Sequence, residues 1–270
     1  MPAAMRPAVR AVYAFARSAD DFADNGTLPA EERLALLQAY VDDLDRIAAG
    51  HDCALPVLRT LAAVISEHAL PLQPFRDLLS AFQQDVVVHS YASRAAVLDY
   101  CRRSADPVGR IMLALWRRQE PELQVASDAI CTALQLINFL QDIAIDSRIP
   151  RIYIADEVLQ QFDLSHADLL QRPLACQTPL RALVLSECAW TRRHMLRGAS
   201  LPAALGGRIG LELALVVAGG LRILDKIEAV EGDVWQRRPR LAGLDWPRLA
   251  WRAWIRGFAV GQTHAAGTGR

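Results

Sequence analysis

Five polar side chains fall at helical spacing in two segments that lie more than a hundred residues apart. Asp20 and Asp24 share one helix face, and Asn138, Asp142 and Asp146 share another, because residues four apart lie on the same side of an α-helix. Like charges at this spacing cost about 0.2–0.5 kcal/mol even on an exposed helix, and more on an apolar stripe. Magnesium prefers oxygen ligands and shares them with substrate phosphates. We therefore interpret the five residues as a predicted acidic cage for magnesium and a diphosphate.

The second segment is the more specific of the two. Apolar residues crowd positions 134–145, so that Asn138, Asp142 and Asp146 form only a thin polar seam. Surface helices normally present a wide polar face. The seam therefore either faces a polar cavity or leaves carboxylates buried without partners, which is rarely tolerated.

Basic residues accompany both segments. Arg17 precedes Asp20 by one helical turn, and a loop at residues 148–154 contains Arg151 and Tyr153. A guanidinium group can bind phosphate oxygens in bidentate fashion. Taken alone, the first segment could be a solvated helix end and the loop an ordinary surface loop. Their position beside the cage favours diphosphate binding.

The elements that must position these residues are helices, since apolar residues recur every three or four positions and no alternating strand is found. We expect one all-α domain over residues 1–260 and a flexible tail over residues 261–270. The expected helices cover residues 7–24, 54–67, 71–89, 92–118, 122–147, 179–197, 202–230 and 246–258, with a further one after Thr27 and a looser stretch at 148–178.

Composition excludes several classes of protein. The 270 residues include 52% hydrophobic and 22% charged residues, so global disorder is excluded. A net charge of zero argues against nucleic-acid binding. Five cysteines without a CxxC motif favour reduced thiols in a cytoplasmic protein. The apolar stretch 211–224 is too short and too interrupted to span a membrane, so any membrane contact is expected to be peripheral, through the Trp-rich segment 246–254.

The motifs resemble the squalene/phytoene synthase family of trans-isoprenoid enzymes. Residues 17–24 are similar to its first aspartate-rich motif, residues 138–146 to its second, and residues 151–154 to the Gly-Arg-x-Tyr-Leu-Pro sequence that follows it. Residues 100–109 resemble the family's Tyr-Cys-x-x-x-Ala-x-x-Val-Gly helix. Within the family, residues 13–24, 81–85, 104–109 and 220–228 are most similar to the hydroxysqualene synthase branch of bacterial hopanoid and squalene pathways.

The resemblance implies an isoprenoid-synthase helical bundle around a central apolar cavity. It implies that presqualene diphosphate and water become hydroxysqualene and diphosphate, with Mg²⁺ as cofactor and other enzymes of the squalene pathway as partners. Metal ligands would be Asp20, Asp24, Asn138, Asp142 and Asp146, of which the four aspartates are the catalytic residues. Substrate would be bound by Arg17, Tyr100, Asn138, Arg151 and Tyr153. Such a cavity could be lined by Phe15, Phe22, Val108, Met112, Leu134, Ile137 and Leu215, all of which could equally be helix-packing core.

Three positions depart from the family pattern. Pro150 replaces the glycine before Arg151, Ala155 replaces the proline of the same motif, and Asp106 replaces an asparagine. The family's N-terminal helix is also expected to be missing.

Two alternatives stay open. Head-to-head condensation of two prenyl diphosphates, to presqualene diphosphate, squalene or phytoene, would use the same cage. A non-catalytic relative that acts in assembly or interaction would be expected to lose cage aspartates, and all five cage positions are present here.

Overall fold

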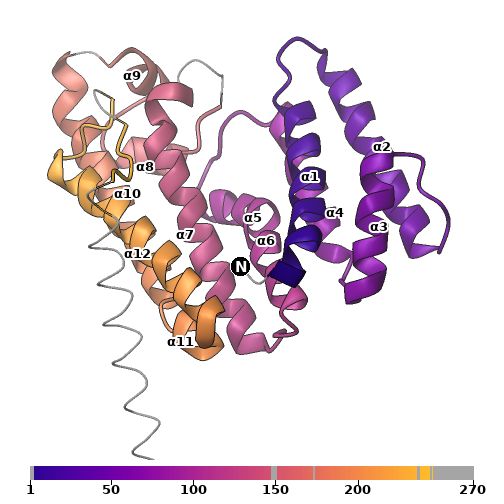
Figure 1. The fold of residues 1–270 in the computed structure, drawn as a ribbon. Coiled ribbons are helices and arrows are strands. Elements are labelled where there is room, and N and C mark those ends of the chain that lie inside the picture. The colour runs from indigo at the N-terminus through magenta and orange to yellow at the C-terminus, as the bar shows by residue number, and fades with distance from the viewer. Residues whose placement is uncertain (1–2, 147–150, 173, 236–237, 244, 246–270) are drawn as a thin grey trace, which may run out of the picture. The chain divides into compact units, whose positions relative to one another are not determined.

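The protein folds into helices, as expected. The computed structural model describes residues 3–146, 151–172, 174–235, 238–243 and 245, and these contain no strand. The chain divides into two compact units: unit 1 comprises Met1–His89 and Ala95–Gln124, and unit 2 comprises Ser90–Arg94 and Val125–Arg270. Figure 1 shows the helices of both. The expected helix at 246–258 and the expected tail lie outside the described residues.

Unit 1 is built from the N-terminal helices. In chain order these are η1 (Ala3–Met5), α1 (Arg6–Ala23), α2 (Ala30–Ala48), α3 (Pro56–His68), α4 (Gln73–Val87), α5 (Arg94–Ser104) and α6 (Asp106–Leu115). α1 packs against α2, α3 and α4, and α4 also packs against α2 and α6.

The core of unit 1 centres on Phe15 of α1, which is fully buried. Its ring contacts Phe75 edge-on at 5.5 Å between centroids and lies 5.9 Å from the ring of Tyr40. Aromatic pairs at these distances contribute beyond the area they bury. The apolar stripe of α1 is therefore fixed from α2 and α4, which sets the direction of its polar face.

The single helix expected over residues 92–118 is wrong, because the structure has two helices there. α5 ends at Ser104 and α6 begins at Asp106, with Pro107 in its first turn. Proline lacks the N–H that an interior helical position would donate, but it is well suited to the start of a helix.

A buried hydrogen bond links α4 and α5 within unit 1. The Tyr100 hydroxyl donates to Oδ2 of Asp85 at 2.8 Å, and both residues are buried. Beside it, the Arg103 guanidinium donates to Ser80 at 2.9 Å and to Asp99 at 3.0 Å. The Tyr100 and Arg103 side chains therefore hold α5 against α4 within unit 1.

Unit 2 contains most of α7 (Pro121–Asp146), which enters it at Val125, and the helices that follow. These are α8 (Asp156–Gln161), α9 (His166–Gln171), η2 (Leu174–Cys176), α10 (Gln177–Arg197), α11 (Leu201–Leu205) and α12 (Gly207–Ala229). The single helix expected over residues 202–230 is wrong, because α11 stops at Gly206, whose φ of 63° lies in the left-handed region.

The short stretch Ser90–Arg94 belongs to unit 2 because it is bound there by hydrogen bonds and charge. The backbone N–H of Asp156 donates to the Tyr91 carbonyl at 2.8 Å, and the N–H of Arg94 donates to the Glu157 carboxylate at 2.7 Å. The Arg94 guanidinium also pairs with buried Glu187 and lies 5.0 Å from the centre of the Trp190 ring. Burial raises the pKa of Glu187, and Arg94 opposes this rise.

Two glycines let α7, α10 and α12 approach closely (Figure 1). A Cβ atom at Gly198, just after α10, would lie 2.4 Å from the carbonyl oxygen of Ala126 and 2.5 Å from Ile130, both on α7. At Gly220 of α12 it would lie 2.7 Å from Met195 of α10 and 3.1 Å from Ile137 of α7. This packing fixes α7 against its neighbours.

α7 is also long and apolar. Among the described residues, Pro121–Ile143 is long and apolar enough to cross a membrane by length and composition, and 56% of its most apolar window is buried inside the protein. The buried core helix of a water-soluble protein meets the same criteria, so this finding is weak support for a membrane span.

We predict that Gly198→Ala destabilises the protein by about 1–3 kcal/mol, because the added methyl overlaps a backbone oxygen that cannot move independently of α7. Urea unfolding followed by circular dichroism measures the change. Gly26→Ala is the matched control, since nothing lies within 4 Å of a Cβ at that position. Equal unfolding midpoints for the two variants would contradict the packing argument.

Tyr100→Phe is expected to lower the free energy of unfolding by about 1–3 kcal/mol, because buried Asp85 loses a hydroxyl donor. Tyr13→Phe, at a side chain that is 67% exposed, is expected to leave stability unchanged. Thermal denaturation of both variants tests the prediction, and a Tyr100→Phe variant that melts with the wild type would refute it.

Candidate active site

The polar seam predicted on α7 is present in unit 2. Asn138 is exposed and Asp142 is partly buried, whereas Ile137, Phe139 and Leu140 around them are buried. The helix therefore presents a narrow polar strip on an apolar surface, as the sequence predicts. Asp146 ends α7, and its side chain lies outside the described part of the chain.

Asp142 forms an ion pair with Arg238, which is distant from it in the sequence. Nη2 of Arg238 lies 2.5 Å from Oδ1 of Asp142, and the two side chains are 34% and 27% exposed. Burial raises the pKa of Asp142, and the positive charges of Arg238 and Arg240 oppose this rise. The fold thus disfavours the ionised carboxylate, and cationic groups offset part of that cost.

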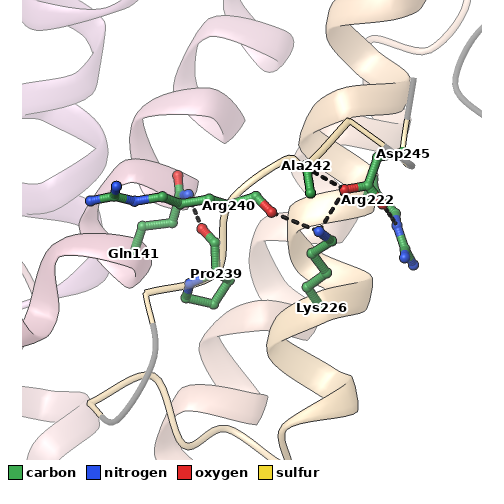
Figure 2. Close-up of polar contacts among 7 residues, drawn as sticks. All are labelled: Gln141, Arg222, Lys226, Pro239, Arg240, Ala242 and Asp245. Carbon is green, nitrogen blue, oxygen red and sulfur yellow. Dashed lines mark hydrogen bonds and ion pairs between the residues drawn. The ribbon is translucent and has the colours of Figure 1, made fainter.

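Arg238 belongs to a segment that we call the C-terminal strap, residues 238–243 and 245. Figure 2 shows how polar contacts hold it on α7 and α12. From α7, Nε2 of Gln141 donates to the Pro239 carbonyl at 2.5 Å, and from α12, Nζ of Lys226 donates to the Arg240 carbonyl at 2.6 Å.

Asp245 anchors the end of the strap. It is 3% exposed and accepts hydrogen bonds from the Ala242 backbone at 2.7 Å, from Lys226 at 2.5 Å and from Arg222 at 2.8 Å (Figure 2). The Ala242 N–H, together with Lys226 and Arg222, holds the pKa of this carboxyl well below its ordinary range. Asp245 therefore stays ionised and bound at neutral pH.

A cavity of about 520 Å³ lies in unit 2 between α7, α12 and the strap. Its size falls within the usual range for small-molecule sites. Asn138 and Gln141 reach it from α7, and Arg238 and Arg240 reach it from the strap. The remaining wall is apolar or glycine: Leu134, Ile137, Leu215, Val216, Gly219, Gly220, Ile223 and Leu241.

Seven residues are predicted to line the substrate cavity, and three of them reach the cavity of unit 2. Leu134, Ile137 and Leu215 line this cavity. The other four residues do not line it: Phe15, Phe22 and Met112 belong to or pack against the core of unit 1, and Val108 is 45% exposed.

The first acidic motif lies in unit 1, at the end of α1. Arg17 pairs with Asp20 at 3.4 Å and with Asp21 at 2.6 Å, and all three side chains are well exposed. Asp24 is the C-terminal cap of α1, and its backbone N–H donates to the Asp20 carbonyl at 2.9 Å. Asp21, which is not among the predicted site residues, is the closer partner of Arg17.

Tyr100 is predicted to bind substrate, and its hydroxyl donates to Asp85 within unit 1. Arg17, Asp20, Asp24 and Tyr100 thus belong to unit 1, whereas Asn138, Asp142, Asp146, Arg151 and Tyr153 belong to unit 2. The two halves of the predicted cage therefore belong to different units.

The loop after α7 is described from Arg151 onward, so Pro150 lies outside the described residues. The Tyr153 ring stacks on Phe139 at 3.8 Å between centroids and lies 5.8 Å from the ring of Tyr91. Arg151 lines a cavity of only about 10 Å³ beside these rings, which has room for about one water. In this conformation that small cavity does not admit a diphosphate.

The chemistry of the α7 seam fits magnesium. Among the described residues, no group of three or more His, Cys, Asp or Glu side chains is arranged to hold a metal ion. Asn138 and Asp142 nevertheless present an amide and a carboxylate oxygen one turn apart, which are ligands of the kind that magnesium binds. Asp142 is also a partly desolvated anion that already attracts a cationic group. The roles of the predicted metal ligands remain predictions.

Arg238 and Arg240 are not among the residues predicted from the sequence. The signal that could have found them is the basic cluster Arg237, Arg238 and Arg240 around Pro239, which, like the loop around Arg151, combines arginines with a proline. Its pairing with α7 is a tertiary contact that no local pattern reveals.

Several proteins of known type are similar to this chain. The hydroxysqualene synthase of Zymomonas mobilis subsp. mobilis is 35% identical over 213 residues, which cover 78% of this chain and 70% of that protein. The phytoene synthase of Arthrospira platensis is 30% identical over 251 residues, covering 88% and 80%. The crystal structure of squalene synthase HpnC from Alicyclobacillus acidocaldarius matches with a TM-score of 0.79 at 34% identity, covering 86% of each chain.

These similarities agree with the motifs and with the helical fold. The sequence profile of squalene/phytoene synthase matches residues 1–245. This chain therefore belongs to the squalene/phytoene synthase family of prenyltransferase-type enzymes.

Proposed function

We propose that this protein converts presqualene diphosphate and water into hydroxysqualene and diphosphate. The observation that carries the proposal is the polar seam of Asn138 and Asp142 beside a largely apolar cavity whose wall also contains Arg238 and Arg240. Such a site combines groups for a charged leaving group with walls suited to a hydrocarbon. The similarity to a hydroxysqualene synthase supports this member of the family's reactions.

The reaction begins with cleavage of the C–O bond to diphosphate, which leaves a carbocation. The leaving group then carries the bonding electrons, so its negative charge must be stabilised as it develops. Asp20, Asp24, Asn138, Asp142 and Asp146 would hold magnesium, which supplies Lewis-acid stabilisation of the diphosphate when bound. Arg17, Arg151 and Tyr153 would add hydrogen-bond donors, and Tyr100 would do so once its hydroxyl leaves Asp85.

The apolar wall has a separate task. A carbocation reacts with any water that reaches it, so the cavity must exclude water except for the one molecule that is incorporated. Leu134, Ile137, Leu215 and Leu241 supply hydrocarbon surface for this purpose. The cyclopropylcarbinyl carbocation rearranges and its three-membered ring opens as a C–C bond breaks. The new C–O bond then forms to that water, whose proton passes to the released diphosphate, which leaves hydroxysqualene.

A second candidate is head-to-head condensation of two prenyl diphosphates. It is favoured by the similarity to a phytoene synthase over 88% of the chain. It would use the same carboxylates and arginines, since it too must release diphosphate.

Location and partners are proposed on the same basis. The cysteine content favours a cytoplasmic enzyme. A C30 lipid substrate favours peripheral membrane contact and exchange of substrate and product with other enzymes of the squalene pathway. The Trp-rich segment 246–254 expected to make that contact lies outside the described residues.

The test is incubation of purified protein with presqualene diphosphate and, separately, farnesyl diphosphate, with magnesium and without NADPH. We expect mass spectrometry to find hydroxysqualene from presqualene diphosphate only, and none after chelation with EDTA. Presqualene diphosphate or a C30 hydrocarbon from farnesyl diphosphate would replace the proposal with the condensation reaction. No turnover of either substrate would favour a non-catalytic relative.

Asp142→Asn is expected to lower the rate of product formation on the order of 100-fold, because an anionic ligand is lost. Its melting temperature at pH 7 is expected to equal or exceed that of the wild type. The reason is that a raised pKa means that the folded protein binds the Asp142 proton more tightly than the unfolded chain does. Stability from this group is therefore lost as pH rises above its unfolded pKa, and a neutral amide avoids that loss.

Asp42→Asn is the matched control for this variant, since Asp42 is exposed on α2 and accepts a hydrogen bond from Gln38. It is expected to keep full activity and wild-type stability. An Asp142→Asn protein that is both fully active and less stable would show that Asp142 is a structural residue.

A further inference from the structure

The Asp142 carboxylate has two competing uses. In this structure one of its oxygens contacts the Arg238 guanidinium at 2.5 Å. The proposed function assigns the same carboxylate to magnesium, and the inference that follows rests on that assignment. Two cationic groups at one carboxylate repel each other, because like charges a few ångströms apart interact strongly where water is partly excluded.

We propose that Arg238 competes with the divalent cation for Asp142, and that Asp245 is the positioning residue that keeps Arg238 within reach. Without the cation, Arg238 neutralises Asp142 and the strap lies against α7. With the cation bound, Arg238 leaves Asp142 but stays in the cavity wall. An anionic group in the cavity then offers the guanidinium a new partner.

The strap is built to hold Arg238 without fixing it to Asp142 alone. Its backbone is bound at Pro239 by Gln141 and at Arg240 by Lys226, and its end is bound at Asp245. These contacts all lie at residues that follow Arg238 in the chain, beginning at the next residue, and none involves its guanidinium. Arg238 can therefore change partner while the strap keeps its place.

Exposure supports the exchange of partners. The Arg238 side chain is 34% exposed, so water can solvate it when the ion pair opens, whereas the Asp245 side chain is only 5% exposed. Asp245 is paired with two cationic residues of α12, Arg222 and Lys226, and with the Ala242 backbone. The anchor is thus the durable contact and the Arg238–Asp142 pair the labile one.

The test is titration of the full-length protein with Mn²⁺ alone, in which electron paramagnetic resonance measures the free ion at constant ionic strength. Arg238→Gln is expected to bind Mn²⁺ about fivefold or more tightly than the wild type, because a competing cationic group is gone. Asp245→Asn is expected to change affinity in the same direction, because the released strap no longer presents Arg238 to Asp142. A purely structural role for Asp245 would weaken binding instead.

Arg208→Gln is the control, since it removes the same charge from an exposed arginine of α12 that pairs with Glu212. It is expected to leave Mn²⁺ affinity unchanged. The double variant Arg238→Gln, Asp142→Asn is expected to lose the gain, which assigns the effect to this carboxylate.

Unchanged or weaker Mn²⁺ binding by Arg238→Gln would overturn the proposal, as would a gain of the same size in Arg208→Gln. This outcome is separate from failure of the proposed function, which is judged by the product formed from presqualene diphosphate. Tighter Mn²⁺ binding without turnover would keep the competition and reject the reaction. Turnover of presqualene diphosphate with unchanged Mn²⁺ affinity in Arg238→Gln would keep the reaction and reject the competition.

Discussion

The constraint on which unit 2 depends is a carboxylate placed on a helix that is otherwise packed. α7 buries apolar side chains on both sides of Asp142, so the charge of this residue is partly removed from water. A packed helix tolerates such a group only when a cation or hydrogen-bond donors face it. The strap supplies that cation from Arg238, and α12 holds the strap. Close packing at Gly198 and Gly220 keeps α7 in place while the seam remains open to a cavity.

In unit 1 the charged side chains of the acidic motif are exposed to solvent rather than partly buried. Arg17, Asp20 and Asp21 are well exposed at the end of α1, where ion pairs contribute little to stability. One buried polar contact of this unit is the hydrogen bond from Tyr100 to Asp85, which joins two helices. The two acidic motifs therefore have unequal structural costs. The first can be accounted for as a solvated helix end, whereas the second requires a compensating group.

Much of this architecture could be predicted from periodicity and spacing. The helical class, the extent of α1 and α7, and the seam at Asn138 and Asp142 all follow from apolar repeats of three and four. The helix breaks before Asp106 and at Gly206 were missed because apolar periodicity continues across them, and only Pro107 and the glycine reveal the change of direction. Phe15 was a candidate cavity residue because an apolar repeat does not distinguish a cavity wall from a core. Arg238 was missed because its partner is distant in sequence and its segment is not periodic.

The strap has one further property that is chemical. Lys226, which donates to the Arg240 carbonyl and pairs with Asp245, is the only lysine among the 270 residues. Apart from the terminal amine, the protein thus offers amine-reactive reagents a single side chain, and that side chain is 23% exposed. Reductive methylation with a ¹³C-enriched reagent would place one NMR-visible label at the strap and nowhere else along the side chains. The position of the strap could then be followed in solution without introducing any substitution.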